Sequence, residues 1–466
     1  MRHSFTFPAI FSSLFLIFTI GFSDNLKASD NGKIIFSKTS TSYKGLINSY
    51  SSNPIMDQID DHVDNFLHKW GVVGASVAIA KNGRMVYAKG FGYADRETGE
   101  PVKPGSLFRI ASVSKLITAT TIMHLVEKGE LKLTDKPFGP QGILNDPAYQ
   151  KIADPRVGTI TINQLLNHTG GWNVRFGDPM FRPIGIARFM HSTPPADMNT
   201  IIRYVLGQKL SFEPGTRYHY SNFGYAVLGK IIEKITGMNY EAYVDQSILW
   251  PLGIFDMRIG KTAPEDRMRN EVKYYEMGKI QKTVPIDGSK QLVPRSYGND
   301  IEDLEGAGGW IASAASILKL VVAIDGNDGS PDILSSESIK TMTDPVLTGY
   351  RPLGWIRIDD QGTWMRTGTM SGSSAVVVRQ NDGVDWVVLF NSSIQYRFLI
   401  HKDMFRLMSQ VISGLSTWPS IDLFCYYQLP PIDPIRILNV IPQDSDLTNV
   451  NNFMASNYGT YVYPNY

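Results

Sequence analysis

The sequence has very little cysteine and no excess of either charge. Cys425 is the only cysteine in 466 residues, which excludes an intramolecular disulfide, a cysteine-rich zinc site and an iron–sulfur cluster. Lysine and arginine together number 45, and aspartate and glutamate 44. A net charge of +1 provides no overall attraction to nucleic acid or to an anionic membrane surface, so neither is an expected partner.

Metal-ligand spacing and cofactor-binding loops are also missing. The eight histidines are scattered, without an H-x-x-x-H pair, so we expect neither a metal nor a cofactor. Hydrophobic residues make up 43% of the chain and charged residues 19%, which is typical of a folded protein. The length is sufficient for two or three domains of roughly 100–200 residues each.

The apolar run at the N-terminus is short for a membrane span. It extends from Phe7 to Phe22 after the basic Arg2, whereas a spanning helix needs about 20 residues. Gly21 and Ser23 are small residues suited to a cleavage site after Ser23. We therefore predict a signal peptide over residues 1–23, export to the periplasm, the cell surface or the medium, and no stable membrane span after cleavage. The alternative is an uncleaved membrane anchor.

Segments with strand character occur near both ends of the chain. Ala75–Ala80 and Met85–Tyr93 flank Asn82-Gly83, a strong hairpin signal because both turn residues tolerate positive φ. Helical periodicity dominates the middle of the chain, and valine-rich runs then follow at Trp364–Thr367, Ala375–Arg379 and Trp386–Phe390. This arrangement predicts an α+β fold, in which an antiparallel sheet is assembled from distant segments and flanked by helices.

The same patterns predict the domain organisation. A polar linker covers residues 24–53, and an irregular C-terminal extension rich in proline, asparagine and tyrosine covers 415–466. Between them we expect a discontinuous α/β domain at 54–130 and 296–414, with an inserted, mostly helical domain at 131–295. Helical spacing is found at Met56–Trp70, Ile201–Leu206, Phe223–Ile235, Ile311–Ile324 and His401–Ile412.

The first candidate for catalysis is Ser112-Val113-Ser114-Lys115. An extended segment precedes it and an apolar stripe follows it, which places Ser112 at the start of a helix with Lys115 one turn away on the same face. A lysine whose pKa is lowered by burial can take the proton of a serine hydroxyl and make it a nucleophile. An S-x-x-K motif alone is weak evidence for a catalytic serine. A second copy, Ser316 to Lys319, lies inside a helical segment, and we interpret Lys319 as solvated.

The second candidate is Tyr220-Ser221-Asn222, just before a helical segment. Tyr220 can act as a general base or acid when a cation lies nearby, and Asn222 can orient a lysine or a substrate amide. Tyr297-Gly298-Asn299 and Tyr463-Pro464-Asn465 show the same Y-x-N pattern. Any one of these motifs alone is therefore equally consistent with a turn capped by asparagine.

The third candidate is Arg366-Thr367-Gly368-Thr369, at the end of a β run. Gly368 lets a ligand approach the strand edge. The backbone N–H groups of Thr369 and Ser112 could together form an oxyanion hole. Taken alone, the motif is better explained as a plain transition from strand to turn.

In this order, these motifs resemble the serine β-lactamase and penicillin-recognising superfamily, above all class C β-lactamases and the related serine esterases and D-peptidases. The resemblance runs from about Met56 to Ile412. Besides the three motifs, it includes Phe108-Arg109-Ile110-Ala111, Lys128-Gly129-Glu130-Leu131, Asp135, Leu165-Leu166-Asn167-His168-Thr169-Gly170-Gly171, Pro214-Gly215-Thr216, Phe223-Gly224-Tyr225, Pro251-Leu252-Gly253, Gly306-Ala307-Gly308-Gly309-Trp310 and Leu353-Gly354-Trp355.

The resemblance implies a site in the cleft between an α/β domain and a helical domain. Ser112 would be acylated, Lys115 would be the base, and Tyr220 would relay protons to the leaving group and activate the deacylating water. His168 matches the family's histidine segment, and we interpret it as structural. The implied function is an exported serine hydrolase acting on an ester, a β-lactam or a D-amino acid peptide or amide. The alternative is a non-catalytic member that binds a peptide, glycan or partner protein in the same cleft.

Arg366 departs from the family pattern, because relatives carry lysine, or often histidine, at this position. Arginine stays protonated and cannot shuttle a proton, but it can bind a carboxylate with two hydrogen bonds. The sequence therefore favours a substrate that bears a carboxylate, and it argues against efficient β-lactamase activity. The alternative is an internal salt bridge of Arg366.

Overall fold

The computed structural model describes residues 26–28, 34–36 and 45–427, apart from 174–176, 279–280, 287–288, 290, 349–350 and 394–396. The predicted signal peptide and the extension after Tyr427 lie outside the described residues. The chain divides into two units. In the unit of residues 1–44 and 430–466, the described residues form β1 (Leu26–Ala28) and β2 (Ile34–Phe36), which pair antiparallel. All other described residues belong to the unit of residues 45–429.

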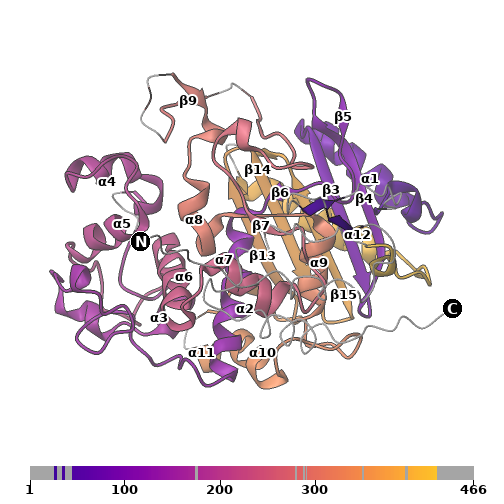
Figure 1. The fold of residues 1–466 in the computed structure, drawn as a ribbon. Coiled ribbons are helices and arrows are strands. Elements are labelled where there is room, and N and C mark those ends of the chain that lie inside the picture. The colour runs from indigo at the N-terminus through magenta and orange to yellow at the C-terminus, as the bar shows by residue number, and fades with distance from the viewer. Residues whose placement is uncertain are drawn as a thin grey trace, which may run out of the picture. The chain divides into compact units, whose positions relative to one another are not determined.

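The larger unit is built around a seven-stranded antiparallel sheet (Figure 1). Its strand order is β12-β13-β14-β15-β3-β4-β5. The two distant strand groups meet where β15 pairs with β3, for example at Val388 and Val77. The predicted sheet from both ends of the chain is therefore confirmed. Its strands are β3 (Gly74–Lys81), β4 (Arg84–Asp95), β5 (Glu100–Pro101), β12 (Arg357–Ile358), β13 (Trp364–Met370), β14 (Ser373–Arg379) and β15 (Val384–Phe390).

Helices cover both faces of this sheet. α1 (Asp57–Trp70) and α12 (Arg397–Ser413) pack on one face, where Val77 and Trp386 belong to a shared core. α9 (Ala314–Val322) packs against β3 and β15 outside that core. β3 and β15 are buried along nearly their whole length. A strand covered on both faces needs apolar residues at successive positions, which explains the continuous apolar runs in the sequence.

Several of the remaining helices pack beside α2 (Figure 1). α2 (Ser114–Glu127) is buried along most of its length because it contacts α6 (Asn222–Thr236) and α8 (Ile301–Gly308). Residues 45–429 form a single compact unit, and the domain boundaries predicted within it stay a prediction. The other helices are α3 (Ile162–Leu166), α4 (Pro183–Phe189), α5 (Met198–Leu206), α7 (Tyr240–Val244), α10 (Ser336–Thr343) and α11 (Pro345–Thr348).

Of the helices predicted above, the one over Ile311–Ile324 is wrong at its start. Trp310–Ala312 forms a strand, β11, which pairs with β6 (Phe108–Arg109) and β7 (Arg258–Ile259). Ser313 then caps α9 by accepting a hydrogen bond from the backbone N–H of Ser316. Periodicity alone does not separate a strand from a helix within a continuous apolar run.

The second S-x-x-K copy is more buried than predicted. The Ser316 hydroxyl is fully buried, donates to Asp256 at 2.6 Å and contacts the Tyr427 hydroxyl. Lys319 is half-buried over the rings of Phe424 and Tyr427, and burial lowers its pKa. The prediction of a solvated lysine is therefore wrong. These residues hold the described part of the C-terminal extension against α9.

Membrane spans and metal clusters are both missing from the described part of the chain. No helix there is both long and apolar enough to cross a membrane. No three histidine, cysteine, aspartate or glutamate side chains within the same residues come together in a way that could hold a metal ion.

Candidate active site

The candidate nucleophile lies on a strained turn between β6 and α2. Ala111–Val113 forms a single 3-10 turn, and α2 begins only at Ser114. The backbone of Ala111 has a φ of 48°, in the left-handed region that residues other than glycine rarely adopt. Strain of this kind persists where the surrounding structure fixes a functional group. Ser112 stays partly exposed, whereas Lys115 is fully buried.

Lys115 lies close to the Ser112 hydroxyl. Its Nζ is 3.4 Å from Ser112 Oγ, and it donates to Asn222 Oδ1 at 2.7 Å and to the Ala307 carbonyl. Burial lowers the pKa of Lys115, and the positive charge of Arg366 adds to this effect. A lysine that gives up its proton more easily than usual can serve as the base for a serine hydroxyl. Asn222 orients this lysine, which is one of the two roles that the sequence suggested.

Tyr220 is the second group on the nucleophile. Its hydroxyl donates to Ser112 Oγ at 2.7 Å, and its ring centroid lies 4.9 Å from Lys115 Nζ. Burial by itself would raise the pKa of Tyr220, but the charges of Lys115 and Arg366 and the hydrogen bonds to Lys115 and Ser112 outweigh burial and lower the pKa to about 8. The phenolate is therefore accessible near neutral pH, as a residue that exchanges protons with a substrate requires.

His168 supports Tyr220 through its ring. The two ring centroids are 4.4 Å apart, and His168 Nδ1 accepts a hydrogen bond from the backbone N–H of Ser221 at 3.2 Å. Burial, and then the charges of Lys115 and Arg366, hold the pKa of His168 well below its usual value. The ring is therefore neutral and keeps this acceptor. The placement agrees with the interpretation of His168 as a structural residue.

Arg366 projects from β13 into the same site. Its side chain is 1% exposed, its Nε donates to the Ser112 carbonyl at 2.7 Å, and one terminal nitrogen donates to the Tyr220 hydroxyl at 3.1 Å. Among the residues that the structure describes, no carboxylate forms an ion pair with Arg366. The internal salt bridge considered above is thus not found there, and carboxylate binding stays a prediction.

Gly368 allows β13 to pass close to the nucleophile turn. A Cβ atom at this position would lie 2.2 Å from the Ile110 carbonyl oxygen and 3.1 Å from the backbone nitrogen of Ser112. Thr369 follows on the strand, and its hydroxyl lies 3.2 Å from His401 Nε2. The close approach brings β13 beside the Ser112 amide. The oxyanion role of the Ser112 and Thr369 amides stays a prediction.

We expect Gly368→Ala to lower kcat/KM by about 10²-fold, because the added methyl group must push β13 and the Ser112 turn apart, and a shift of about 1 Å in a reacting group costs this much. The unfolding free energy should also fall by about 1–3 kcal/mol through overpacking. Ester turnover and thermal unfolding measure both effects. Gly105→Ala is the control, since a Cβ atom there meets nothing within 4 Å. If Gly368→Ala turned over the ester as fast as wild type, the close approach of β13 would not be what positions Ser112.

Asp178 belongs to the site and was not predicted from the sequence. Asn222 Nδ2 donates to Asp178 Oδ2 at 2.7 Å, which extends the chain of hydrogen bonds that starts at Lys115. In the sequence, Asp178-Pro179 looks like any aspartate that opens a short helical turn, as Asp146-Pro147 does. No local signal separates the two aspartates, because the difference lies in a contact between distant segments.

Arg109 anchors the strand that leads into Ser112. Its guanidinium donates to the carbonyls of Ser296 and Lys261, each at 2.6 Å. The same group lies 4.4 Å from the ring centroid of Tyr274 and 5.2 Å from that of Tyr297. Tyr297, one of the other Y-x-N matches, therefore supports the scaffold and lies outside the Ser112 cluster.

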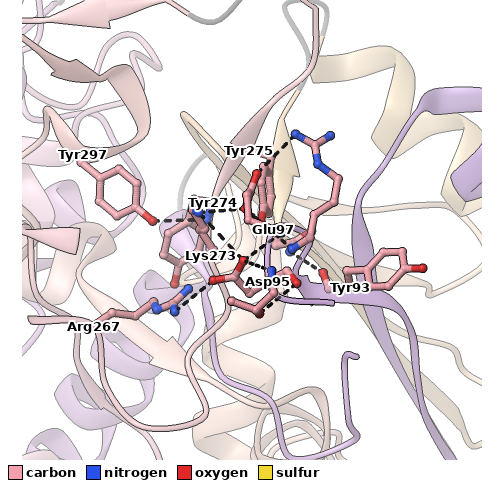
Figure 2. Close-up of polar contacts among 11 residues, drawn as sticks. Tyr93, Asp95, Glu97, Arg267, Lys273, Tyr274, Tyr275 and Tyr297 are labelled. Atoms are coloured by element: carbon pink, nitrogen blue, oxygen red, sulfur yellow. Dashed lines mark hydrogen bonds and ion pairs between the residues drawn. The ribbon is translucent and has the colours of Figure 1, made fainter. Parts of the chain in front are cut away.

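A polar network fixes the segment that carries Tyr274 (Figure 2). The segment around β8 (Tyr275–Glu276) is tied to Glu97, which follows β4, by Lys273 at 2.8 Å and by the Tyr275 hydroxyl at 2.6 Å. Arg267 pairs with Asp95 at 3.5 Å. The hydrogen bonds from Lys273 and Tyr275 lower the pKa of Glu97, so the network keeps its charge at neutral pH.

A serine hydroxyl that contacts a buried lysine and a tyrosine of lowered pKa, next to an antiparallel sheet, defines the class of S-x-x-K serine hydrolases. The family profile Beta-lactamase matches residues 59–406. The chain therefore belongs to the beta-lactamase family and is a serine hydrolase, and the resemblance stated from the sequence is confirmed.

Two relatives align with this chain over more than two thirds of their own length. Esterase EstB from Burkholderia gladioli is 30% identical over 287 residues, which cover 58% of this chain and 70% of the esterase. Protein flp from Staphylococcus aureus strain N315 is 28% identical over 374 residues, which cover 78% of this chain and 68% of that protein.

Solved structures confirm the predicted fold class. The octameric penicillin-binding protein homologue from Pyrococcus abyssi superposes with a TM-score of 0.55 at 25% identity, covering 76% of this chain and 77% of that chain. The D-amino acid amidase from Ochrobactrum anthropi SV3 has a TM-score of 0.60 at 23% identity, covering 78% of this chain and 98% of the amidase, and so shares the fold.

Proposed function

We propose that this protein is an exported hydrolase that forms an acyl-enzyme on Ser112 with ester or D-amino acid amide substrates. The observation that carries the proposal is the placement of two proton-transfer groups on one oxygen. The Tyr220 hydroxyl is 2.7 Å, and Lys115 Nζ 3.4 Å, from Ser112 Oγ. The similarity to an esterase supports an ester as the acyl donor, and the amidase with the same fold supports an amide.

In this mechanism, Ser112 Oγ attacks the carbonyl carbon of the acyl donor. Lys115 in its neutral form takes the hydroxyl proton, while the amides of Ser112 and Thr369 stabilise the negative oxygen. The bond between the carbonyl carbon and the leaving group then breaks, and Tyr220 delivers a proton to the leaving alcohol or amine. Water then attacks the carbonyl carbon of the acyl-enzyme, and the Tyr220 phenolate accepts the proton of that water. The bond between the carbonyl carbon and Ser112 Oγ breaks, Lys115 returns its proton to Ser112 Oγ, and the carboxylic acid leaves.

The proposal of export rests on the signal peptide predicted over residues 1–23. We propose that the mature protein acts in the periplasm, at the cell surface or in the medium. Amino-terminal sequencing of protein recovered outside the cytoplasm tests this: a first residue of Asp24 supports cleavage after Ser23, and a retained Met1 supports the anchor.

A substrate panel tests the proposed chemistry. Short-chain p-nitrophenyl esters, D-alanine amide, nitrocefin and a D-Ala-D-Ala peptide are compared at equal enzyme concentration, and Ser112→Ala serves as the control. Hydrolysis of esters or D-amino acid amides that is lost in Ser112→Ala supports the proposal. If wild type hydrolyses none of these and is not labelled by a fluorophosphonate, the non-catalytic alternative takes its place.

We expect Arg366→Gln to move the pH dependence of ester hydrolysis to higher pH. Lys115 must be neutral to take the Ser112 proton, and its pKa is lowered by burial and by the positive charge of Arg366. Loss of the Arg366 charge raises the pKa of Lys115, so the rise of kcat/KM with pH occurs at higher pH. The pKa of Tyr220, about 8 in wild type and lowered partly by Arg366, also rises, so the fall of kcat/KM at high pH shifts in the same direction. At a pH below the pKa of Lys115 in both proteins, kcat/KM falls by about tenfold if that pKa rises by about 1.

The measurement is kcat/KM for a neutral ester between about pH 6 and pH 10. Arg366→Lys is the control, because it keeps the positive charge and should keep the inflection closer to that of wild type. An unchanged inflection in Arg366→Gln would contradict this electrostatic role. Raised KM in Arg366→Lys for carboxylate-bearing substrates only would instead support the carboxylate-binding role predicted from the sequence.

A further inference from the structure

The end of α8 supplies a hydrogen-bond acceptor to the candidate base. Lys115 Nζ lies 3.4 Å from Ser112 Oγ and donates to the carbonyl of Ala307. Thr118, one turn further along α2, donates from Oγ1 to the carbonyl of Gly306 at 2.8 Å. Carbonyls in the last turn of a helix have no partner within the helix, so these two are available to α2. The position of the Lys115 amine therefore depends on the direction of the α8 backbone at these carbonyls.

Glu305, the residue before these carbonyls, has an unusual backbone conformation. Its φ is 27° and its ψ is −114°, which resembles the first central position of a type II′ turn, where glycine is normally found. A residue with a side chain is strained there, whereas glycine is not. Such strain persists only where the surrounding structure imposes it. Contacts of Glu305 must therefore hold the turn in place.

The Glu305 side chain is held by an ion pair with α6. Its Oε2 lies 3.4 Å from Lys230 Nζ, and the two side chains are 19% and 22% exposed, so solvent screens their attraction only in part. Lys230 also pairs with Glu233, on its own helix, at 2.9 Å. The pair with Glu305 is different because it joins α6 to α8, and both of these helices contact α2. It fixes the point at which the backbone turns toward α2.

The backbone that follows this turn lies against α2 and the nucleophile. A Cβ atom on Gly306 would lie only 2.8 Å from Thr118 Oγ1. A Cβ atom on Gly308 would lie 3.8 Å from the carbonyl carbon of Ala111, which itself has a positive φ of 48°. Two strained turns are thus in contact, and a shift of the α8 turn would be transmitted to the base and to the nucleophile turn.

The two acceptors of Lys115 match the donors of a neutral amine. A lysine side chain has three N–H donors when charged and two after it has lost one proton. Asn222 Oδ1 and the Ala307 carbonyl accept two hydrogen bonds from Nζ. The lone pair of the neutral amine then remains for the proton of Ser112. Without the Ala307 carbonyl, the amine can rotate and turn its lone pair away from the nucleophile.

We propose that Glu305 is a positioning residue for Lys115. Its ion pair with Lys230 holds a strained turn, and the carbonyl of Ala307 after that turn orients the amine toward Ser112. The proposal rests on the proposed function at Ser112. It explains why a glutamate, and not a glycine, occupies a conformation that favours glycine: the carboxylate fixes the direction of a backbone that glycine would leave free.

The test measures how fast a fluorophosphonate labels Ser112, because this reaction needs the same base as acylation. The rate at saturating reagent, the half-saturating concentration and the final labelled fraction are determined for wild type, Glu305→Gln, Glu305→Gly, Lys230→Met and Glu233→Gln. The labelled fraction counts folded sites, so a loss of folded protein is separated from a slower reaction. At about pH 8.5 the Glu305 carboxylate is charged, since burial raises its pKa to about 7. Glu233→Gln is the matched control, because it removes the other carboxylate from the same lysine.

We expect Glu305→Gln and Lys230→Met to lower the saturated rate by about 10- to 100-fold, the effect of a reacting group displaced by up to about 1 Å. The half-saturating concentration should stay within about threefold. Glu305→Gly should lose clearly less, because glycine adopts the turn without strain, and Glu233→Gln should react within about threefold of wild type.

A wild-type rate in Glu305→Gln would overturn the proposal. It would be overturned as well if only the labelled fraction or the half-saturating concentration changed, if Glu305→Gly were as slow as Glu305→Gln, or if Glu233→Gln were equally slow. A failure of the proposed function is seen in a different protein of the set: wild type itself would then not be labelled.

Discussion

Ser112→Ala is expected to lower ester or amide turnover by about 10⁴-fold or more while the protein stays folded. The Ser112 hydroxyl is the atom that would form the acyl bond, and no other group replaces it. Its loss should hardly affect stability, because α2 begins at Ser114 and the Ser112 hydroxyl does not cap it. The unfolding free energy should change by about 1 kcal/mol or less. Turnover, fluorophosphonate labelling and thermal unfolding are the measurements.

Ser316→Ala is the matched control, since Ser316 heads the other S-x-x-K copy. Its hydroxyl is buried and hydrogen-bonded to Asp256 and Tyr427, so its removal leaves buried polar groups without a partner. We expect lower thermal stability with near wild-type turnover. The reverse result, with activity lost in Ser316→Ala and kept in Ser112→Ala, would show that Ser112 is the wrong serine.

Lys115→Ala and Tyr220→Phe are each expected to lower kcat by about 10²-fold or more, because each removes a proton-transfer group from the same oxygen. The double variant should lose less than the product of the two single losses, since both groups serve one relay. Lys115→Ala also removes one of the charges that lower the pKa of Tyr220, which couples the two residues further. The measurement is kcat for wild type, the two single variants and the double variant, which together form a double-mutant cycle.

Tyr225→Phe controls for the loss of a buried tyrosine hydroxyl in the same cluster. Its ring centroid is 5.5 Å from Lys115 Nζ, but its hydroxyl donates to the Leu166 carbonyl at 2.8 Å and not to Ser112. We expect a loss of stability of about 1–2 kcal/mol and a much smaller effect on kcat than in Tyr220→Phe.

Fully independent effects of Lys115→Ala and Tyr220→Phe in the double-mutant cycle would argue against a shared relay.

Much of the sheet could be predicted because its signals are local. Asn82-Gly83 marks the turn between β3 and β4, as predicted. The error at Trp310–Ala312 has a physical cause. This apolar stretch becomes a strand only because β6 and β7 lie on either side of it, and both partners are far away in the sequence.

In the candidate site too, the local sequence predicts some contacts, whereas others depend on segments that are distant in the chain. Ser112 and Lys115 are one turn apart, so their proximity follows from helical geometry alone. Tyr220 and Arg366 were placed with them through the family resemblance, because their separations in sequence carry no geometric information. In the folded chain, two donors of Arg366 bind the Ser112 carbonyl and the Tyr220 hydroxyl, which the sequence did not indicate, and carboxylate binding stays a prediction.

The sequence by itself determined the α+β class, the family and the candidate site residues, because periodicity and short motifs are properties of neighbouring residues. Only the tertiary structure decided how those residues are charged and held. The lowered pKa values of Lys115 and Tyr220 depend on burial and on Arg366, which lies far from both in the chain. The contact between Asn222 and Asp178 depends in the same way on packing between distant segments. Electrostatic energies follow distances and burial in the folded chain, and a sequence does not contain either quantity.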